Sequence, residues 1–503
     1  MKKVVSYFGG KTYFWCVVAI IVCASFLRLY QLPQYATFLG DQGRDAIVMK
    51  DIITFKDFTA LGPITSVGSI YLGPFYYYLM APWIGLFGLD PVGPAYGVAL
   101  ISIIGIMLQY LAVKDIADRQ TALISIALTA FSWVLIEYSR FSWNPNLLAP
   151  ASFFVLYVLT KAIRTKRVVW YAALGALLSA IVQLHYLALF LVPFSGIAIV
   201  LSFIHYKKTD WPNALKNIVI CFAAFTIVIS PFILFEIKHH FPNVTSAINF
   251  SRENSSKSGT SNPLNEFVDT SSKLITYSFQ VNEPGMYATW AMVVVLFITP
   301  FIFYFHATKK KLSLSSDGIF LLTLGSLFFL IGTSLYHGPK YPHYLGGLYI
   351  LLYVQLAYLL RTVAQGQARI VGRVVVVLLL AVFVVFNAKH YIFLYQKRGP
   401  EEIARARAVA QTVADMKPVM PYTLTSSPQA YADYTYRYFL DAWGLKPVPK
   451  EQDINVATQT LFVVCEKQCD PMKDSQWAIA HFSPRKITDE KKSGDMYIYR
   501  LIK

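Results

Sequence analysis

Long apolar runs separated by short polar segments dominate most of the chain. A transmembrane helix needs about 20 consecutive, mainly apolar residues, and eleven runs come close to that length. They lie at residues 13–30, 95–113, 121–136, 146–161, 168–184, 187–204, 217–235, 286–306, 318–336, 344–361 and 370–390. The pattern predicts an α-helical polytopic membrane protein with about eleven transmembrane helices.

A twelfth apolar run, residues 71–88, contains Pro74 and Pro82, and each proline removes a helix hydrogen bond. The distribution of basic residues indicates its role, because lysine and arginine concentrate in cytoplasmic loops. Four basic segments follow the run, at 161–167, 205–208, 306–311 and 361–373. All four fall on the same side as the basic N-terminus only if residues 71–88 do not cross. We therefore expect an in-plane or re-entrant helix there, with the N-terminus inside and the C-terminus outside.

This topology places five loops on the exterior side of the membrane. They are residues 31–94, 137–145, 185–186, 236–285 and 337–343. The segment 251–273 is rich in Ser and Asn, which is typical of a flexible loop. Residues 1–25 would also fit a signal peptide, but the many spans that follow favour an uncleaved first helix.

The C-terminal region, residues 395–503, is polar and has a different pattern. An amphipathic helix is predicted at 401–416 and strands at 460–466 and 496–502. We expect a small extracytoplasmic α/β domain, following a transmembrane catalytic domain that comprises residues 1–394. The pair Cys465 and Cys469 lacks the further ligands of a zinc site. A disulfide between them is possible if this domain lies outside the cytoplasm.

Composition agrees with a membrane protein. Hydrophobic residues make up 55% of the chain and charged residues 15%, whereas soluble domains carry about 25% charged residues. The net charge of +17 therefore argues little for a nucleic-acid partner. Basic residues of membrane proteins mark cytoplasmic loops or contact lipid phosphates.

The polar clusters all fall on the predicted exterior side. They are ATFLGDQGRD (36–45), SRFSWNPN (139–146), FEIKHHFPNV (235–244) and HGPKYPHY (337–344). A transporter would instead carry ionisable residues inside its spans. The clusters predict a site at the outer membrane surface, which suits a substrate with a lipid tail and a polar head.

Such a site needs a carboxylate base and cations for a phosphate. Asp41 or Asp45 can be the base, and Asp41 is favoured because it follows a span closely. For Asp45 and Asp51 a simple ion pair is the favoured interpretation, and Arg140 could merely snorkel at the interface. The phosphate contacts predicted here are Arg44, Arg140, Lys340, His343 and His239 or His240.

These motifs resemble the GT-C superfamily of membrane glycosyltransferases. The aspartate of the first exterior loop, GPFYYYLMAPW (73–83) and SRFSWNPNLLAP (139–150) are most similar to the protein O-mannosyltransferases and the lipid A aminoarabinose transferases. In layout the resemblance covers residues 10–395. It implies transfer of a sugar from a polyprenyl-phosphate carrier to an acceptor hydroxyl, with inversion, in the cell membrane.

The resemblance also implies roles for individual residues. Asp41 takes the position of the general base, while Gln42 and Asn146 stand where the family commonly has acidic residues. These neutral amides permit a divalent metal but do not require one. Basic residues of the fourth and fifth loops would contact the carrier phosphate. The substrate-binding residues predicted in all are Gln42, Arg44, Asp45, Arg140, Asn146, His239, His240, Arg252, Lys340 and His343.

Three alternatives stay open. The main one is a membrane transporter or lipid-carrier flippase without transferase activity. The others are a non-catalytic scaffold and a polymer-elongating transferase of the same superfamily. The expected partners are a polyprenyl-phosphate sugar donor, an acceptor that is lipid, glycan or protein, and membrane lipid. The sequence specifies neither the sugar nor the acceptor.

Overall fold

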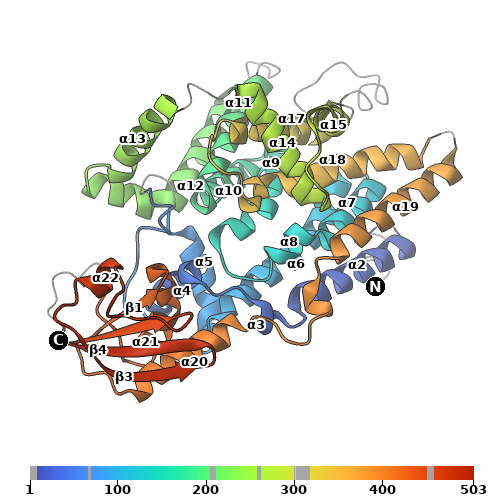
Figure 1. The fold of residues 1–503 in the computed structure, drawn as a ribbon. Helices are drawn as coiled ribbons and strands as arrows, with labels where there is room; N and C mark the ends of the chain where they lie inside the picture. Colours follow the sequence, from blue (N-terminus) through green and yellow to red (C-terminus); the bar gives the residue numbers. More distant parts are fainter. Residues whose placement is uncertain are drawn as a thin grey trace.

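A computed structural model shows a large helical bundle joined to a small domain that contains a β-sheet (Figure 1). The structure describes residue 8 and residues 10–65, 70–203, 211–257, 262–298, 301, 318–366, 368–449 and 458–503. In Figure 1 the sheet domain, coloured orange to red, lies beside the helices of the first exterior loop.

Each of the eleven apolar segments contains a helix. These helices are α2 (Lys11–Leu29), α6 (Val92–Ile116), α7 (Arg119–Phe131), α9 (Leu148–Thr165), α10 (Val168–Leu184), α11 (Leu191–Phe203), α12 (Trp211–Lys238), α15 (Met286–Val293), α17 (Gly318–Ser334), α18 (Gly346–Ala364) and α19 (Arg369–Ala388). Among the described residues, seven helical segments are long and apolar enough to cross a membrane, and three further apolar ones are shorter. Residues 299–300 and 302–306 of the predicted eighth span lie outside the described residues. The number of crossings and their orientation stay predictions.

Burial distinguishes central from peripheral helices. The segments containing α9 and α18 bury 72% and 67% of their apolar windows, against 6% for α12 and 22% for α19. On α12, Phe222 and Ile227 leave 70% and 71% of their surface exposed. Apolar surface on this scale indicates contact with lipid or with another protein, and a peripheral position in a membrane bundle accounts for it.

Contacts between the loops define two ends of the bundle. At the basic end, Lys161 and Arg164 pair with Asp115, and Arg361 pairs with Asp118. At the opposite end, which we call the loop end, the predicted exterior loops meet one another. These contacts bring together three segments that the map predicts on one side, while the basic segments 205–208 and 306–311 lie outside the described residues. The alternation of the spans stays a prediction.

The doubtful apolar run forms helix α5 (Phe75–Leu86), with Pro82 inside it. Its 12 residues span about 18 Å at 1.5 Å per residue, less than the ~30 Å hydrocarbon core. Tyr76, Tyr77 and Met80 are buried in a cluster that also includes residues of α6 and of the C-terminal domain. A helix this short and this enclosed fits the in-plane prediction, and its orientation to a membrane stays a prediction.

The exterior loops contain more regular structure than their composition suggests. The first contains α3 (Leu32–Tyr35) and α4 (Gly40–Ile53), and α8 (Trp133–Glu137) precedes the second. The fourth contains α13 (Pro242–Lys257) and α14 (Pro263–Phe279). The expectation of a flexible loop at 251–273 is wrong for the described part, because α14 packs against α15 and α17 through an amphipathic face. Short helical turns lie at the second, third and fifth loops: η1 (Asn144–Leu147), η2 (Tyr186–Phe190) and η6 (Pro342–Leu345). Two others lie elsewhere, since η5 (Val294–Ile298) continues α15 and η7 (Ile392–Leu394) follows α19.

The C-terminal domain has the predicted α/β character. Its elements are α20 (Glu402–Asp415), β1 (Thr423–Ser427), η8 (Ala430–Asp433), α21 (Tyr434–Ala442), β2 (Thr460–Cys465), α22 (Trp477–Ala480), β3 (Lys486–Ser493) and β4 (Met496–Ile502). The strand order is β1-β2-β4-β3, and only the β1–β2 pair is parallel. Cys465 and Cys469 form a disulfide, which is typical of an oxidising, non-cytoplasmic compartment. The domain boundary near residue 394 stays a prediction.

Candidate active site at the loop end

Helix α4 begins within the GDQGRD sequence and determines how its side chains point. The Gln42 side chain accepts a hydrogen bond from the Leu39 backbone N–H at 3.0 Å, which caps the first turn. Asp41 lies in that first turn, where the helix dipole favours a negative charge. Gln42 is buried, so its local role is to hold the helix start, and its contact with substrate stays a prediction.

Asp41, Arg44 and Asp45 form a charged cluster on one side of α4. The Arg44 guanidinium lies 3.1 Å from Asp41 Oδ1 and donates to Asp45 Oδ1 at 2.7 and 2.9 Å. The Tyr431 hydroxyl, from the C-terminal domain, donates to Asp41 Oδ1 at 2.6 Å and accepts from Arg44 at 2.5 Å. Asp41 is the accessible member, since its side chain is 36% exposed against 2% for Asp45.

Asp45 and Asp51 both make the ion pairs that were expected of them. Asp51 pairs with Lys50 at 2.5 Å. Asp45 also accepts from the Tyr77 hydroxyl at 2.9 Å, and its Oδ2 atom is buried without a hydrogen-bond partner among the described residues. Burial raises the pKa of Asp45, and Arg44 opposes that effect. The enclosed Asp45 carboxylate binds Arg44 and Tyr77, and its predicted contact with substrate stays a prediction.

Arg140 is engaged within the protein, and its predicted phosphate contact stays a prediction. Its guanidinium donates to the carbonyls of Leu27 and Tyr30, each at 2.8 Å. Its charged group also lies 4.0 Å from the centre of the Phe393 ring. The side chain is buried and joins the second loop to the end of α2.

Asn146 also serves the second loop locally. Its Nδ2 atom donates to the Phe141 carbonyl at 2.7 Å, and Oδ1 is buried without a hydrogen-bond partner among the described residues. Asn144 donates in the same way to the Leu184 carbonyl, which attaches the second loop to the end of α10.

Lys340 is likewise engaged within the protein. It pairs with Glu266 at 2.6 Å and with Asp269 at 3.6 Å, both on α14, and its side chain is 2% exposed. A lysine on the predicted exterior side runs against the tendency of basic residues to lie in cytoplasmic loops. The explanation in the structure is an ion pair between the fourth and fifth loops, and not an exposed phosphate contact.

His343 lies in an aromatic cluster where the second, third and fifth loops meet. Its ring centre is 4.6 Å from Trp143, 4.5 Å from Tyr344 and 6.0 Å from His185. Burial lowers the pKa of His343 to about 4 and that of His185 to about 3. Both imidazoles are therefore neutral near pH 7, and His343 can offer a phosphate a hydrogen bond but not a positive charge.

His239 and His240 lie in the turn between α12 and α13, Arg252 lies on α13, and all three are exposed. In Figure 1, α13 is well separated from α4. The turn nevertheless meets the first loop, because Asn243 accepts a hydrogen bond from the Tyr71 backbone at 2.6 Å. The structure thus brings the fourth loop to the first, and contact of these three basic side chains with the substrate stays a prediction.

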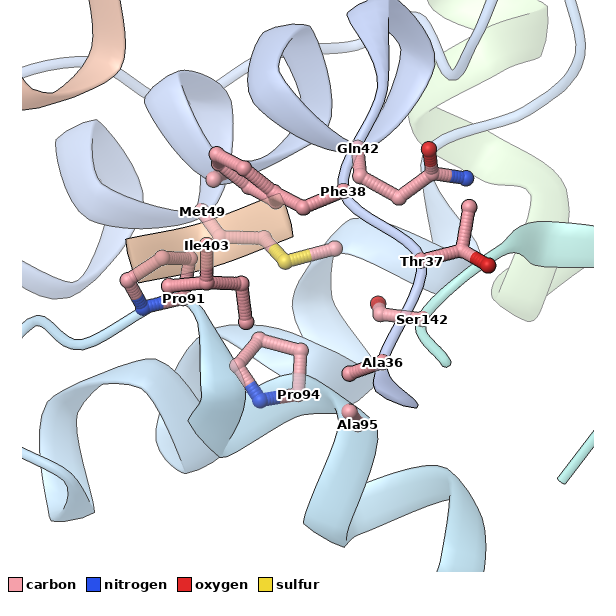
Figure 2. A pocket seen from close by; sticks show the side chains of 11 residues that line it. Ala36, Thr37, Phe38, Gln42, Met49, Pro91, Pro94, Ala95, Ser142 and Ile403 are labelled. Atoms are coloured by element: carbon pink, nitrogen blue, oxygen red, sulfur yellow. The ribbon is translucent and has the colours of Figure 1, made fainter. Parts of the chain in front are cut away.

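A small cavity lies on another face of α4 (Figure 2). Apolar side chains line most of it, and its polar members are Thr37, Gln42 and Ser142. Ser142 is hydrogen-bonded to the Tyr76 hydroxyl at 2.8 Å. Asp41 does not line this cavity, so the cavity is not the proposed reaction centre.

Among the described residues, no group of three His, Cys, Asp or Glu side chains is arranged to hold a metal ion. The sequence interpretation missed Tyr431 entirely. It lies 390 positions after Asp41, and the surrounding QAYADYTY carries no recognisable motif. Trp143 was noted only as part of its loop sequence.

Comparison with known proteins supports the resemblance found in the sequence. A family model described as dolichyl-phosphate-mannose-protein mannosyltransferase matches residues 72–235. A search of curated proteins gives no significant match.

Solved structures match over nearly the whole chain. ArnT from Cupriavidus metallidurans, bound to undecaprenyl phosphate, has a TM-score of 0.61 at 14% identity, covering 97% of this chain and 98% of ArnT. The Archaeoglobus fulgidus oligosaccharyltransferase in complex with Zn and sulfate has a TM-score of 0.51 at 13% identity, covering 89% and 67% of the two chains. AglB from the same organism, in complex with an inhibitory peptide and a dolichol-phosphate, has a TM-score of 0.50 at 10% identity, covering 90% of this chain and 69% of AglB. The chain therefore shares the fold of ArnT over nearly its whole length.

Proposed function

We propose that this chain, which has the fold of the GT-C membrane glycosyltransferases, transfers a sugar from a polyprenyl-phosphate-linked donor to an acceptor hydroxyl. The match to ArnT over 97% of the chain supports this proposal, since that structure holds undecaprenyl phosphate. The family match over residues 72–235 supports it independently. The reaction takes place on the extracytoplasmic side, where the loop end and the disulfide-bonded domain would lie.

The observation that carries the proposal is the position of Asp41. Its carboxylate is accessible, lies at the start of α4 and is oriented by Arg44 and Tyr431. In the proposed step this carboxylate takes the proton of the acceptor hydroxyl while the oxygen attacks the anomeric carbon. The bond from that carbon to the phosphate oxygen breaks, and its electron pair leaves with the phosphate. Attack opposite the leaving group inverts the anomeric carbon, and one base is sufficient.

The leaving phosphate needs positive charge or hydrogen bonds, because negative charge develops on it. Arg44 is the candidate that lies beside the proposed base, whereas Arg140 and Lys340 are buried and engaged elsewhere. His343 would act as a neutral hydrogen-bond donor. Contacts from His239, His240 and Arg252 would require movement of the fourth loop toward α4.

The proposal is tested with the purified protein in vesicles supplied with labelled undecaprenyl-phosphate sugars and a lipid, glycan or peptide acceptor. We expect covalent transfer of label, with release of undecaprenyl phosphate. Movement of the labelled carrier across the vesicle bilayer without transfer would instead favour the lipid-carrier flippase. If no hexose or pentose donor gives either transfer or movement, the proposed function is contradicted.

A further inference from the structure

The C-terminal domain packs directly against α4, the helix that carries Asp41. In Figure 1, α21 lies beside α4. Apolar residues of both helices belong to one buried cluster, which includes Ala46, Met49 and Ile52 of α4 and Tyr436 and Phe439 of α21. The proposed catalytic loop and the C-terminal domain therefore share a core.

Two glycines of α4 allow this close approach. A Cβ atom on Gly40 would lie 2.4 Å from the Tyr431 ring, and one on Gly43 would lie 2.5 Å from the Tyr434 carbonyl carbon. Both distances are below the contact that real Cβ atoms adopt, so any larger residue would push the domain away. Glycine destabilises a helix relative to alanine. The close approach of the C-terminal domain explains why these two positions of α4 are glycine.

Hydrogen bonds and an ion pair hold the two ends of α4 to the same domain. At the start of the helix, the Tyr431 hydroxyl binds both Asp41 and Arg44. Near its other end, Lys50 lies 3.2 Å from Asp441 of α21, and both side chains are almost fully buried. The orientation of α4 therefore depends on a domain more than 380 residues away in the sequence.

We propose that Tyr431 is a positioning residue for the base, so that the C-terminal domain completes the active site; this inference rests on the proposed function. Arg44 and Tyr431 both contact Oδ1 of Asp41. Oδ2 is then the carboxylate oxygen that takes the proton of the acceptor. Without the Tyr431 hydroxyl, the carboxylate of Asp41 is free to rotate toward Arg44, and Oδ2 is no longer held where it can take the proton.

The test compares Tyr431→Phe with Tyr422→Phe in the full-length protein. Tyr431→Phe keeps the ring that packs against Gly40 and removes the hydroxyl. We expect kcat to fall about tenfold with little change in donor KM, because poor positioning of a catalytic group can cost up to ~100-fold. The acidic limb of the pH profile should move to higher pH, since a hydrogen bond to the ionised carboxylate is lost. Tyr422 donates to the Leu445 carbonyl inside the same domain, and Tyr422→Phe should leave both rate and profile unchanged.

Tyr431→His provides a second variant, because it retains a ring and an N–H donor and should recover part of the rate. Equal rates and pH profiles for Tyr431→Phe, Tyr422→Phe and the unchanged protein would overturn the inference while leaving the proposed function intact. Equal losses in Tyr431→Phe and Tyr431→His, accompanied by lower thermal stability and an unshifted pH profile, would assign Tyr431 to domain packing alone. Absence of transfer by the unchanged protein would count against the proposed function instead.

Discussion

Arg140 offers a sharp test, because the sequence and the structure give it different roles. The sequence predicts a phosphate contact, whereas the structure shows a buried cross-link between the second loop and the end of α2. Replacement by methionine keeps much of the side-chain volume and removes the charge and all donors. The change should therefore unfold or loosen the protein and not merely weaken donor binding.

The structure gives the expected size of the effect. Hydrogen bonds to charged groups contribute about 1.5–3 kcal/mol each, and Arg140 makes two to carbonyl oxygens. Its contact with the Phe393 ring at 4.0 Å adds roughly 0.5–2 kcal/mol. Methionine recovers part of the packing, so we expect a loss of about 3–5 kcal/mol in the free energy of unfolding.

The assay is thermal unfolding of the detergent-purified protein, combined with the donor KM of the folded fraction. Arg407→Met is the control, since Arg407 is about half exposed and pairs with Asp90 at the surface. Exposed pairs of this kind contribute about 0–1 kcal/mol. If Arg140→Met unfolds at the same temperature as the unchanged protein but has a donor KM raised tenfold or more, Arg140 is a phosphate ligand and our interpretation is wrong.

Three further predictions follow from the loop end. Burial lowers the pKa of His343 to about 4, so its imidazole is already neutral above pH 5. His343→Gln should therefore change the rate without changing the pH profile of activity between pH 6 and 8. An inflection near pH 6.5 that His343→Gln abolishes would refute this. Lys340→Met leaves Glu266 and Asp269 without their cation, so we expect a lower unfolding temperature. The double variant Lys340→Met/Glu266→Gln should partly restore that temperature. If it does not, Lys340 has a role beyond the ion pair. A single cysteine at Pro91, at the start of α6, should react with an impermeant thiol reagent in intact cells, whereas labelling only after lysis would contradict the in-plane position of α5.

The sequence predicted best those features that depend on local pattern. Apolar runs predicted where helices form, since a run long enough for the membrane core is also long enough to form a stable helix there. The sequence pattern also predicted the amphipathic helix and two buried strands of the C-terminal domain. Strands β1 and β3 were missed, because their sequences TLTSS and KITDEKKS are mainly polar. Both strands lie at the edges of the sheet, where polar sequences are common.

The roles of charged residues depended on partners far away in the chain. Lys340 was assigned to a phosphate because it lies on the exterior side, but Glu266, 74 positions earlier, neutralises it. Arg140 is occupied by carbonyls 110 and 113 positions away. The sequence singled out Asp41 in the first loop, and its role as the base stays a prediction, but the sequence could not show that Tyr431 reaches it. Long-range packing decides which charges face a substrate, and local spacing carries no information about it.

The most direct test of the central claim is the rate of sugar transfer by Asp41→Asn beside that by Asp90→Asn, in membranes containing equal amounts of each protein. Asp90 is a matched control, because it lies in the same loop, is similarly exposed at 30% and also pairs with one arginine. General base catalysis contributes about 100- to 10,000-fold, so we predict at least a 100-fold loss for Asp41→Asn and near-normal transfer for Asp90→Asn. Equal transfer by the two variants would contradict the assignment of Asp41 as the base.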